Sequence, residues 1–571
     1  FPGARAWSKY VDPIKLDGAD TIYLSYYNNI IALIPPKANE VKLDYEPQSD
    51  ADKFGYTESA TDLMLKYKAL TFDISRSFDN GEWHYSYNSS AEFVNSSLIK
   101  AVLPDFSEAY FVKENKYSYT EQLSNAKLMM IYDEADEHII GCSIKTDSRS
   151  YGYKYNGEKF ILSSVSDFYG NSFDFTRQNN RIAIVDNSGR ECIIKCDNNT
   201  TTLADFNGGI ITYNYADDNL VSVTDQTGVI IDSYTYSDGK ITKSGMMSVE
   251  YDSNGRVVKY HYDNGAYTAF EYGENSITTT NSKEEVSSYT YDSKDRIISE
   301  TDNLGDETVY TYDDNERTVK ISRDGEVLKT YKYNADGTLF SEQPKDKDAT
   351  EYYYDSHKRV ITEITPDDYI HYVYDDFGNL TMTARVKDYY IENKYYYFIK
   401  IQNNLDYYNI TRYTYENGLL VKSYDEENDV TVLYEYDDYG NTVLQTTLTV
   451  KDDATQIVKT ESRYDILGRL VWSKSNDSET EYTYDAAGRL LLTKTDDNYY
   501  QRTVYDNNGR IVQEIDNDKY DPLLDNLPYA YSDTTAGKTY VYNQYGDLIK
   551  ETNSFGISTD YEYSDTGNVY R

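Results

Sequence analysis

A short motif that returns every 20 or 21 residues constrains this chain more than any other feature of its sequence. The motif reads Tyr-Asp-x-x-Gly-Arg, and it recurs from about residue 150 onward. A fixed period of this length is typical of repeat proteins, in which each unit is one small supersecondary structure that packs mainly on its neighbours. The clearest copies are Tyr251, Asp252, Gly255 and Arg256; Tyr464, Asp465, Gly468 and Arg469; Tyr484, Asp485, Gly488 and Arg489; and Tyr505, Asp506, Gly509 and Arg510.

Each unit reads as two strands and two turns. In the copy around Tyr312, residues 307–312 alternate between two faces, as a strand requires. The polar residues 313–316 form a turn, because Asp and Asn side chains bond nearby backbone amides. Residues 317–321 are the return strand, and the motif glycine of better copies permits a positive φ. One unit of about 21 residues therefore predicts one short β-hairpin.

The number of units predicts a curved sheet. More than about 30 short strands in series would extend on the order of 150 Å at about 4.8 Å per strand. Open sheets rarely exceed about ten strands without curling. The composition agrees with a β fold, since the chain contains 66 Tyr and only 10 Pro. We therefore expect an all-β protein, a long spiral of antiparallel β-hairpins.

The motif and its period resemble the YD repeat of rearrangement-hotspot (RHS) proteins, which also occurs in teneurins and in the shells of insecticidal toxin complexes. The resemblance covers about residues 150–571 and implies a hollow β-shell that is secreted or displayed at a cell surface. In toxin members of the family the shell encloses a C-terminal toxin. Those members often carry Asp-Pro-x-Gly motifs where the chain cleaves itself, whereas the nearest sequence here is Asp521-Pro522-Leu-Leu. No catalytic residue is therefore carried over.

Residues 1–130 lack the repeat and are expected to form a β-rich N-terminal region, either a small sandwich or a plug of the shell. Within it we expect strands near residues 21–26, 70–74 and 81–87, and short helices near 62–68 and 121–130. Residues 131–571 are assigned to the shell, with insertions near 388–411, 445–460 and 516–538. The chain begins at Phe1 rather than Met and ends within a repeat, so we expect it to be a piece of a longer protein.

Charge and composition exclude several classes of protein. The net charge of −41 repels phosphate groups, so neither nucleic acid nor an anionic membrane surface is expected as a partner. No apolar run is long enough to insert directly into a membrane. The three cysteines, Cys142, Cys192 and Cys196, form no disulfide framework and are expected to be packing thiols. No metal or nucleotide motif is present, so no cofactor is expected, and the acidic stretch 516–521 is only a weak candidate for calcium.

Two functions from different classes remain open. The first is a non-enzymatic scaffold or container whose partner is an encapsulated polypeptide. The second is a surface adhesin that binds carbohydrate through Tyr-rich faces, with Tyr389, Tyr390 and Tyr407 as the candidate contacts. An enzyme in the N-terminal region is a distant third. Both leading hypotheses place the protein outside the cell or at its surface, and the sequence leaves the oligomeric state open.

Overall fold

The described part of this computed structural model comprises the backbone of residues 22–26 and 29–33, together with residues 55–386, 408–515 and 537–561. Gaps fall at 80, 122–125, 147, 207, 246, 263–264, 295, 452–453, 466–467, 485–488, 497–498, 506–509 and 543–547. Most of these residues lie in β-strands, and the only helical element within the described ranges is η1, a 3-10 turn at Ser86–Asn88. None of these ranges holds a helix long and apolar enough to cross a membrane.

Strands outside the main sheet are few and all precede residue 86. They are β1 (Ile22–Tyr26), β2 (Asn29–Leu33), β3 (Glu58–Tyr67), β4 (Leu70–Asp79) and β5 (Glu82–Tyr85). Strands β1 and β2 pair with each other, and β3, β4 and β5 form a three-stranded sheet, named here the inner sheet.

The main sheet, named here the wall, contains every strand from β6 to β48. Its first part comprises β6 (Ser90–Asn95), β7 (Leu98–Val102), β8 (Glu108–Lys113), β9 (Ser118–Glu121), β10 (Lys127–Tyr132), β11 (Ile139–Lys145), β12 (Ser150–Tyr155), β13 (Phe160–Ser166), β14 (Ser172–Gln178), β15 (Arg181–Asp186), β16 (Glu191–Asp197), β17 (Thr200–Ala204), β18 (Ile210–Ala216), β19 (Asn219–Thr224), β20 (Ile230–Ser237), β21 (Lys240–Ser244), β22 (Met247–Tyr251), β23 (Val257–Tyr262), β24 (Tyr267–Tyr272) and β25 (Ser276–Asn281).

The second part of the wall comprises β26 (Val286–Tyr291), β27 (Ile297–Thr301), β28 (Glu307–Asp313), β29 (Thr318–Arg323), β30 (Glu326–Tyr333), β31 (Leu339–Pro344), β32 (Thr350–Tyr354), β33 (Val360–Ile364), β34 (Tyr369–Tyr374), β35 (Leu380–Val386), β36 (Tyr408–Glu416), β37 (Leu419–Asp425), β38 (Val430–Tyr436), β39 (Thr442–Lys451), β40 (Ala454–Tyr464), β41 (Leu470–Ser475), β42 (Ser478–Tyr484), β43 (Leu490–Thr495), β44 (Tyr499–Tyr505), β45 (Ile511–Ile515), β46 (Lys538–Tyr542), β47 (Leu548–Thr552) and β48 (Ser558–Asp560).

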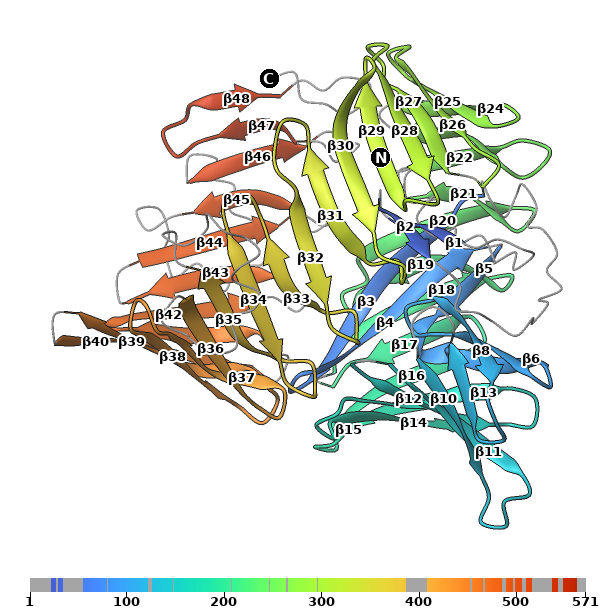
Figure 1. Cartoon of the computed structure of the whole chain (residues 1–571). Coiled ribbons are helices and arrows are strands. Elements are labelled where there is room, and N and C mark those ends of the chain that lie inside the picture. The colour runs from blue at the N-terminus through green and yellow to red at the C-terminus, as the bar shows by residue number, and fades with distance from the viewer. Residues whose placement is uncertain are drawn as a thin grey trace.

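Each wall strand pairs antiparallel with the next one along the chain, so the wall is one continuous meander. It curves around the inner sheet, and Figure 1 shows β3 and β4 in the middle of the molecule with wall strands around them. The expected all-β spiral of antiparallel hairpins is therefore confirmed.

The wall begins as a closed ring. One edge of β13 is shared, because Phe160 pairs with Ala91 of β6 whereas Val165 pairs with Phe173 of β14. The opposite edge of β13 pairs with β12. Strands β6 to β13 therefore close on themselves, and the rest of the wall leaves the ring at β14.

A β-bulge explains why the later wall curls. In the hairpin of β22 and β23, Glu250 pairs with Lys259 but Tyr251 pairs with Val257, so the register shifts directly before the motif tyrosine. The same shift recurs before the corresponding tyrosine in most later units. Bulges bend a strand and increase its right-handed twist, so each repeat adds a similar increment of curvature.

The main hydrophobic core lies between the inner sheet and the first half of the wall. Leu65, Phe72 and Ile74 of the inner sheet are buried there, and the Phe72 ring meets that of Phe175 at 5.1 Å between centroids. Beyond about residue 260 the described residues of the wall form a much smaller buried cluster, which is built around Ile364 and Ile410. Most side chains of the later wall are half-exposed.

The expectation of two short helices in the N-terminal region is wrong. Residues 62–68 lie mostly in β3, where Leu65 and Tyr67 are buried and the intervening Lys66 is exposed. In the second segment, the described residues lie mostly in β9 and β10, where Leu128 and Met130 alternate with exposed neighbours. This alternation has a period of two and matches strands rather than helices.

The expected domain division at residues 130 and 131 stays a prediction, and the wall itself begins at β6. Of the three expected insertions, residues 445–460 lengthen β39 and β40 into a hairpin of 10- and 11-residue strands. Residues 388–407 and 516–536, which make up most of the other two, lie outside the described residues, as does the weak calcium candidate.

Candidate functional site

The repeat turn is held by its aspartate. In the Asp252 turn, Gly255 has φ +85° and its amide donates to the Asp252 carbonyl at 3.0 Å. The Asp252 Oδ1 atom accepts from the amides of Asn254 and Arg256 at 2.9 and 3.0 Å. Its Oδ2 atom accepts from Arg256 Nε at 2.7 Å. The aspartate therefore closes the turn and also fixes the arginine.

The fixed arginine connects one unit to the next. The Arg256 guanidinium lies 4.6 Å from the ring centroid of Tyr272, the tyrosine that precedes the next turn. The Tyr272 hydroxyl donates to the carbonyl of Val257 at 2.6 Å. The same arginine–tyrosine stack recurs at Arg296 and Tyr312, Arg359 and Tyr374, Arg469 and Tyr484, Arg489 and Tyr505, and Arg510 and Tyr542. Each stacked tyrosine also donates to a backbone carbonyl of the preceding unit.

Electrostatics follow from this geometry. Burial would raise the pKa of Asp252, but hydrogen bonds from Arg256 and two backbone amides, with the Arg256 charge, hold that pKa below its usual value. The pKa of Asp292 is lowered in the same way by Arg296. These carboxylates are held in the charged form and serve the turn.

Most of the motif residues predicted from the sequence lie in this turn or in the arginine–tyrosine stack. Asp465 and Gly468 form the same turn as Asp252 and Gly255, and Arg469 bonds Asp465. Asp485, Gly488, Asp506 and Gly509 lie outside the described residues. Sequence reasoning assigned the turn to the aspartate but missed the arginine–tyrosine stack. The sequence does contain a signal for this stack, because a tyrosine follows most motif arginines by 15 or 16 residues.

A buried ion-pair network attaches the inner sheet to the wall. Arg76 of β4 is 0% exposed and donates from Nη1 to Asp62 Oδ1 at 2.8 Å and from Nη2 to Asp232 of β20. The Tyr213 hydroxyl of β18 donates to Asp62 Oδ2 at 2.6 Å. Next to it, Tyr234 of β20 donates to Glu58 of β3 at 3.0 Å.

Local sequence positions this network. Strands β3 and β4 shift register between Thr61 and Leu63, so Asp62 is the extra residue of a bulge. Bulges re-aim side chains, and this one brings the carboxylate to Arg76. Burial raises the pKa of Asp62, and the Arg76 guanidinium opposes that rise. A charge buried in this way is stable only while its partners remain.

The tip of the β3–β4 hairpin reaches a distant part of the wall, at contacts named here the seam. The Lys68 amide donates to the Tyr439 carbonyl at 2.9 Å, and Lys66 Nζ donates to the Gly440 carbonyl at 3.0 Å. Arg190, which follows β15, donates from Nη2 to the Lys66 carbonyl at 2.8 Å and lies 4.0 Å from the Tyr439 ring centroid. The hairpin thus joins an early turn of the wall to a late one.

A second contact continues the seam. The rings of Tyr169 and Phe377 lie 5.1 Å apart between centroids, and Asn379 Nδ2 donates to the Tyr169 hydroxyl. Gly440 at the seam has to be glycine because the backbone of Lys68 lies so close to it. A Cβ built on Gly440 would lie 2.5 Å from the Lys68 Cα. The later wall therefore returns onto the turns that follow β13 and β15, and this return brings the curved sheet around the inner sheet.

The cysteines differ from expectation in one case. Cys142 and Cys192 are buried as expected, and burial raises the pKa of the Cys192 thiol to about 12. Cys196 is exposed, so the expectation of packing is wrong for it. In strand β16, Ile194 is buried, but the three residues that follow it, which include Cys196, are all exposed. Within the described ranges no group of three or more His, Cys, Asp or Glu is arranged to hold a metal ion.

The carbohydrate contacts expected for an adhesin stay a prediction. Tyr389, Tyr390 and Tyr407 lie outside the described residues, so their grouping on a binding face stays a prediction.

Comparisons with known proteins agree with the fold. The RHS Repeat family matches residues 291–327. The crystal structure of TcdB2-TccC3-TEV is similar with a TM-score of 0.53 and 11% identity, and the match covers 95% of this chain and 40% of that one. TcdB2-TccC3 without its hypervariable C-terminal region matches at 13% identity and a TM-score of 0.36, over 89% and 35% of the two chains. The Photorhabdus luminescens Tc holotoxin pore matches at 14% identity and a TM-score of 0.31, over 89% and 35%.

The repeat, its geometry and the matched fold define a β-shell protein built from YD repeats. The resemblance to RHS/YD-repeat proteins noted in the sequence is confirmed, because the RHS Repeat model matches residues 291–327 and the fold matches that of TcdB2-TccC3-TEV. A search of curated protein sequences finds no match. The chain spans less than half the length of the solved chains that it resembles.

Proposed function

We propose that this chain is the wall of a secreted or cell-surface container that encloses a polypeptide and catalyses no reaction itself. The observation that carries the proposal is the continuous meander from β6 to β48, which curves around the inner sheet and contacts its own earlier turns at the seam. A sheet of this kind gives each hairpin little core of its own and is suited to enclosing space.

The half-exposed faces of the later wall also support a container. Beyond residue 260 few described side chains are fully buried, and within the described residues no second layer covers this part of the wall in the way the inner sheet covers β14 to β20. An enclosed polypeptide would supply that layer. The match to the crystal structure of TcdB2-TccC3-TEV covers only 40% of that chain, so the similar protein contains further polypeptide beyond the matched part.

The test is protection of an attached polypeptide from protease. A reporter protein fused after Arg571 should be digested far more slowly than the same reporter fused before Phe1. Particles of the first fusion should show filled density inside the wall by electron microscopy. Equal digestion of the two fusions, with the wall intact, would contradict the container.

A further inference from the structure

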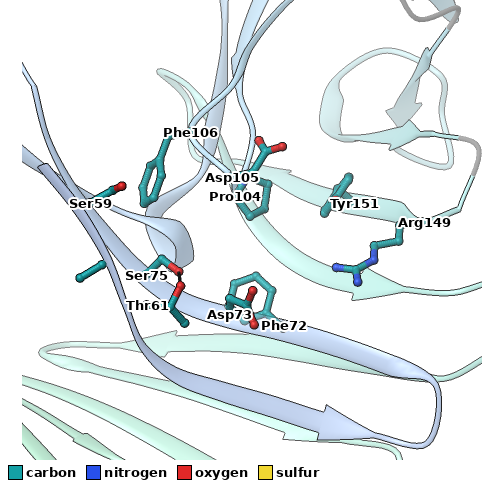
Figure 2. A pocket seen from close by; sticks show the side chains of 11 residues that line it. Ser59, Thr61, Phe72, Asp73, Ser75, Pro104, Asp105, Phe106, Arg149 and Tyr151 are labelled. Atoms are coloured by element: carbon teal, nitrogen blue, oxygen red, sulfur yellow. Dashed lines mark hydrogen bonds between the residues drawn. The ribbon is translucent and has the colours of Figure 1, made fainter. Parts of the chain in front are cut away.

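A cavity of 330 Å³ lies between the inner sheet and the wall, separate from the seam and from the repeat turns. Figure 2 shows Phe106 and Ser59 on one side of it and Arg149 and Tyr151 on the other. The lining comes from β3, β4, the turn between β7 and β8, and the start of β12. Cavities that bind small ligands begin at about 300 Å³, so its size fits a small ligand.

Charged groups of both signs line the cavity. Asp73 and Asp105 supply two carboxylates, and both residues are exposed. Arg149 supplies one guanidinium, which Thr71 orients by accepting from Nη2 at 3.1 Å. Carboxylates accept hydrogen bonds and the guanidinium donates several, so a ligand here meets both kinds of partner.

Hydroxyl groups line the same cavity. Thr61 and Ser75 lie opposite each other on β3 and β4, with their oxygens 2.9 Å apart. The bulge at Asp62 brings that carboxylate to Arg76 while Thr61 remains at the cavity. The polar cavity and the buried ion pair therefore use opposite faces of one strand.

The aromatic ring of Phe106 lines the cavity from the turn between β7 and β8. Phe106 has φ +66°, a conformation that bulky residues rarely adopt and that favours glycine. The turn around it is well bonded, because the Phe106 amide donates to the Leu103 carbonyl at 2.9 Å and Asp105 Oδ1 accepts from the Ser107 hydroxyl at 2.6 Å. The hydrogen bonds of this turn match those of the Asp252 turn, so Phe106 takes the place of the motif glycine and a common hairpin turn holds its ring at the cavity.

We propose that this cavity binds a neutral sugar residue at the end of a glycan. A pyranose ring has an apolar face that would stack on Phe106. Its hydroxyl groups both donate and accept, so they match the carboxylates of Asp73 and Asp105 and the guanidinium of Arg149 together. Two carboxylates against one guanidinium disfavour an acidic sugar. This site shares no residue with Tyr389, Tyr390 or Tyr407 and does not depend on the container function.

The test uses saturation-transfer NMR on the full chain with glucose, galactose, N-acetylglucosamine, glucuronic acid and free phenylalanine as probes. At least one neutral sugar should bind with a dissociation constant on the order of 1 mM, typical of a single small contact. The decisive variant is Phe106→Gly, which removes the ring but suits the positive φ. It should weaken binding at least about tenfold (a loss of about 1.4 kcal/mol) without lowering the melting temperature.

Two further variants sharpen the result. Asp73→Asn should weaken sugar binding, because a carboxylate is a stronger acceptor than an amide. Phe555→Ala, which removes an aromatic ring that is 88% exposed in a distant turn, should leave binding unchanged. The proposal is overturned if no neutral sugar binds, if phenylalanine or glucuronic acid binds instead, or if Phe106→Gly binds as the parent does. A lower melting temperature for Phe106→Gly would also contradict it, since the ring would then serve packing.

Discussion

The covered and the bare parts of the wall use the same repeat position in different ways. This position lies two residues before the tyrosine that follows the bulge. In the covered part it holds Tyr213 and Tyr234, which lie under the inner sheet, are at most 3% exposed, and donate to Asp62 and Glu58 of β3. At the equivalent position of the bare wall, Tyr372 is half-exposed and donates to Glu363 of the wall itself at 2.9 Å.

This difference shows what the inner sheet contributes. In several units of the bare wall the acceptor comes from the wall itself, as Glu363 does for Tyr372 and Glu514 for Tyr540, so these units do not need the inner sheet for this bond. In the covered part the acceptors come from another sheet, and burial raises the pKa of Tyr213 well above its usual value, so its hydroxyl stays protonated as a donor. The covered part of the wall is therefore stable only with the inner sheet in place. The bare part does not depend on the inner sheet in this way.

The largest effect is expected from Arg76→Ala. It leaves Asp62 buried without its cation, and removal of one partner of a buried pair costs about 3–5 kcal/mol. The control Arg412→Ala breaks an exposed pair with Glu426 and should cost less than about 1 kcal/mol. Denaturant unfolding measures both. Equal small losses would show that the inner sheet is not held by this network.

Gly440→Ala tests the seam. Its Cβ would lie 2.5 Å from the Lys68 Cα, and φ is +84°, so strain and a backbone clash add to about 2–4 kcal/mol. The matched control is Gly556→Ala, which has φ +79° and no atom within 4 Å, and should cost only about 1–2 kcal/mol. Hydrogen exchange should speed up at residues 66–70 in the first variant alone. Unchanged exchange there would mean that the hairpin tip is not held by the seam.

A matched pair of tyrosines tests the comparison directly. Tyr213→Phe leaves an Asp62 oxygen buried without its donor and should cost about 1.5–3 kcal/mol. Tyr372→Phe leaves Glu363 where water replaces the hydroxyl, and should cost about 0.5 kcal/mol. Melting curves of the two variants give the comparison. If the two losses are equal, the inner sheet does not change the role of the repeat tyrosine.

The smallest effect is a gain. Lys358 takes the place of the motif glycine in the Asp355 turn and has φ +59°. Lys358→Gly removes that strain but loosens the unfolded chain, so the net stabilisation should be about 0.5–1 kcal/mol. A slightly higher unfolding midpoint is expected. A lower midpoint would show that the lysine side chain matters more than its backbone.

The sequence predicted the hairpin unit, the spiral and the turn role of Asp252, because these depend on residues close together in the chain. It did not predict the seam or the network around Arg76, since Lys66 and Gly440 are brought together only by the accumulated curvature of the wall. The inner sheet was mistaken in part for helix because β3 carries a bulge, which places Asp62 and Leu63 out of strict alternation. The arginine–tyrosine stack was predictable from spacing but was masked by the simpler turn explanation of the motif.

The shared edge of β13 has a consequence for how the molecule forms during synthesis. Residues 90–166 contain every strand of the initial ring, so the ring can close before the later repeats leave the ribosome. Each following strand, from β14 onward, then pairs with the exposed edge of the strand made just before it. The inner sheet precedes the ring in the chain, so it is already synthesised when β14 to β20 pack on it. Such a chain would assemble in the order in which it is translated, from a seed outward, with few chances to pair out of sequence.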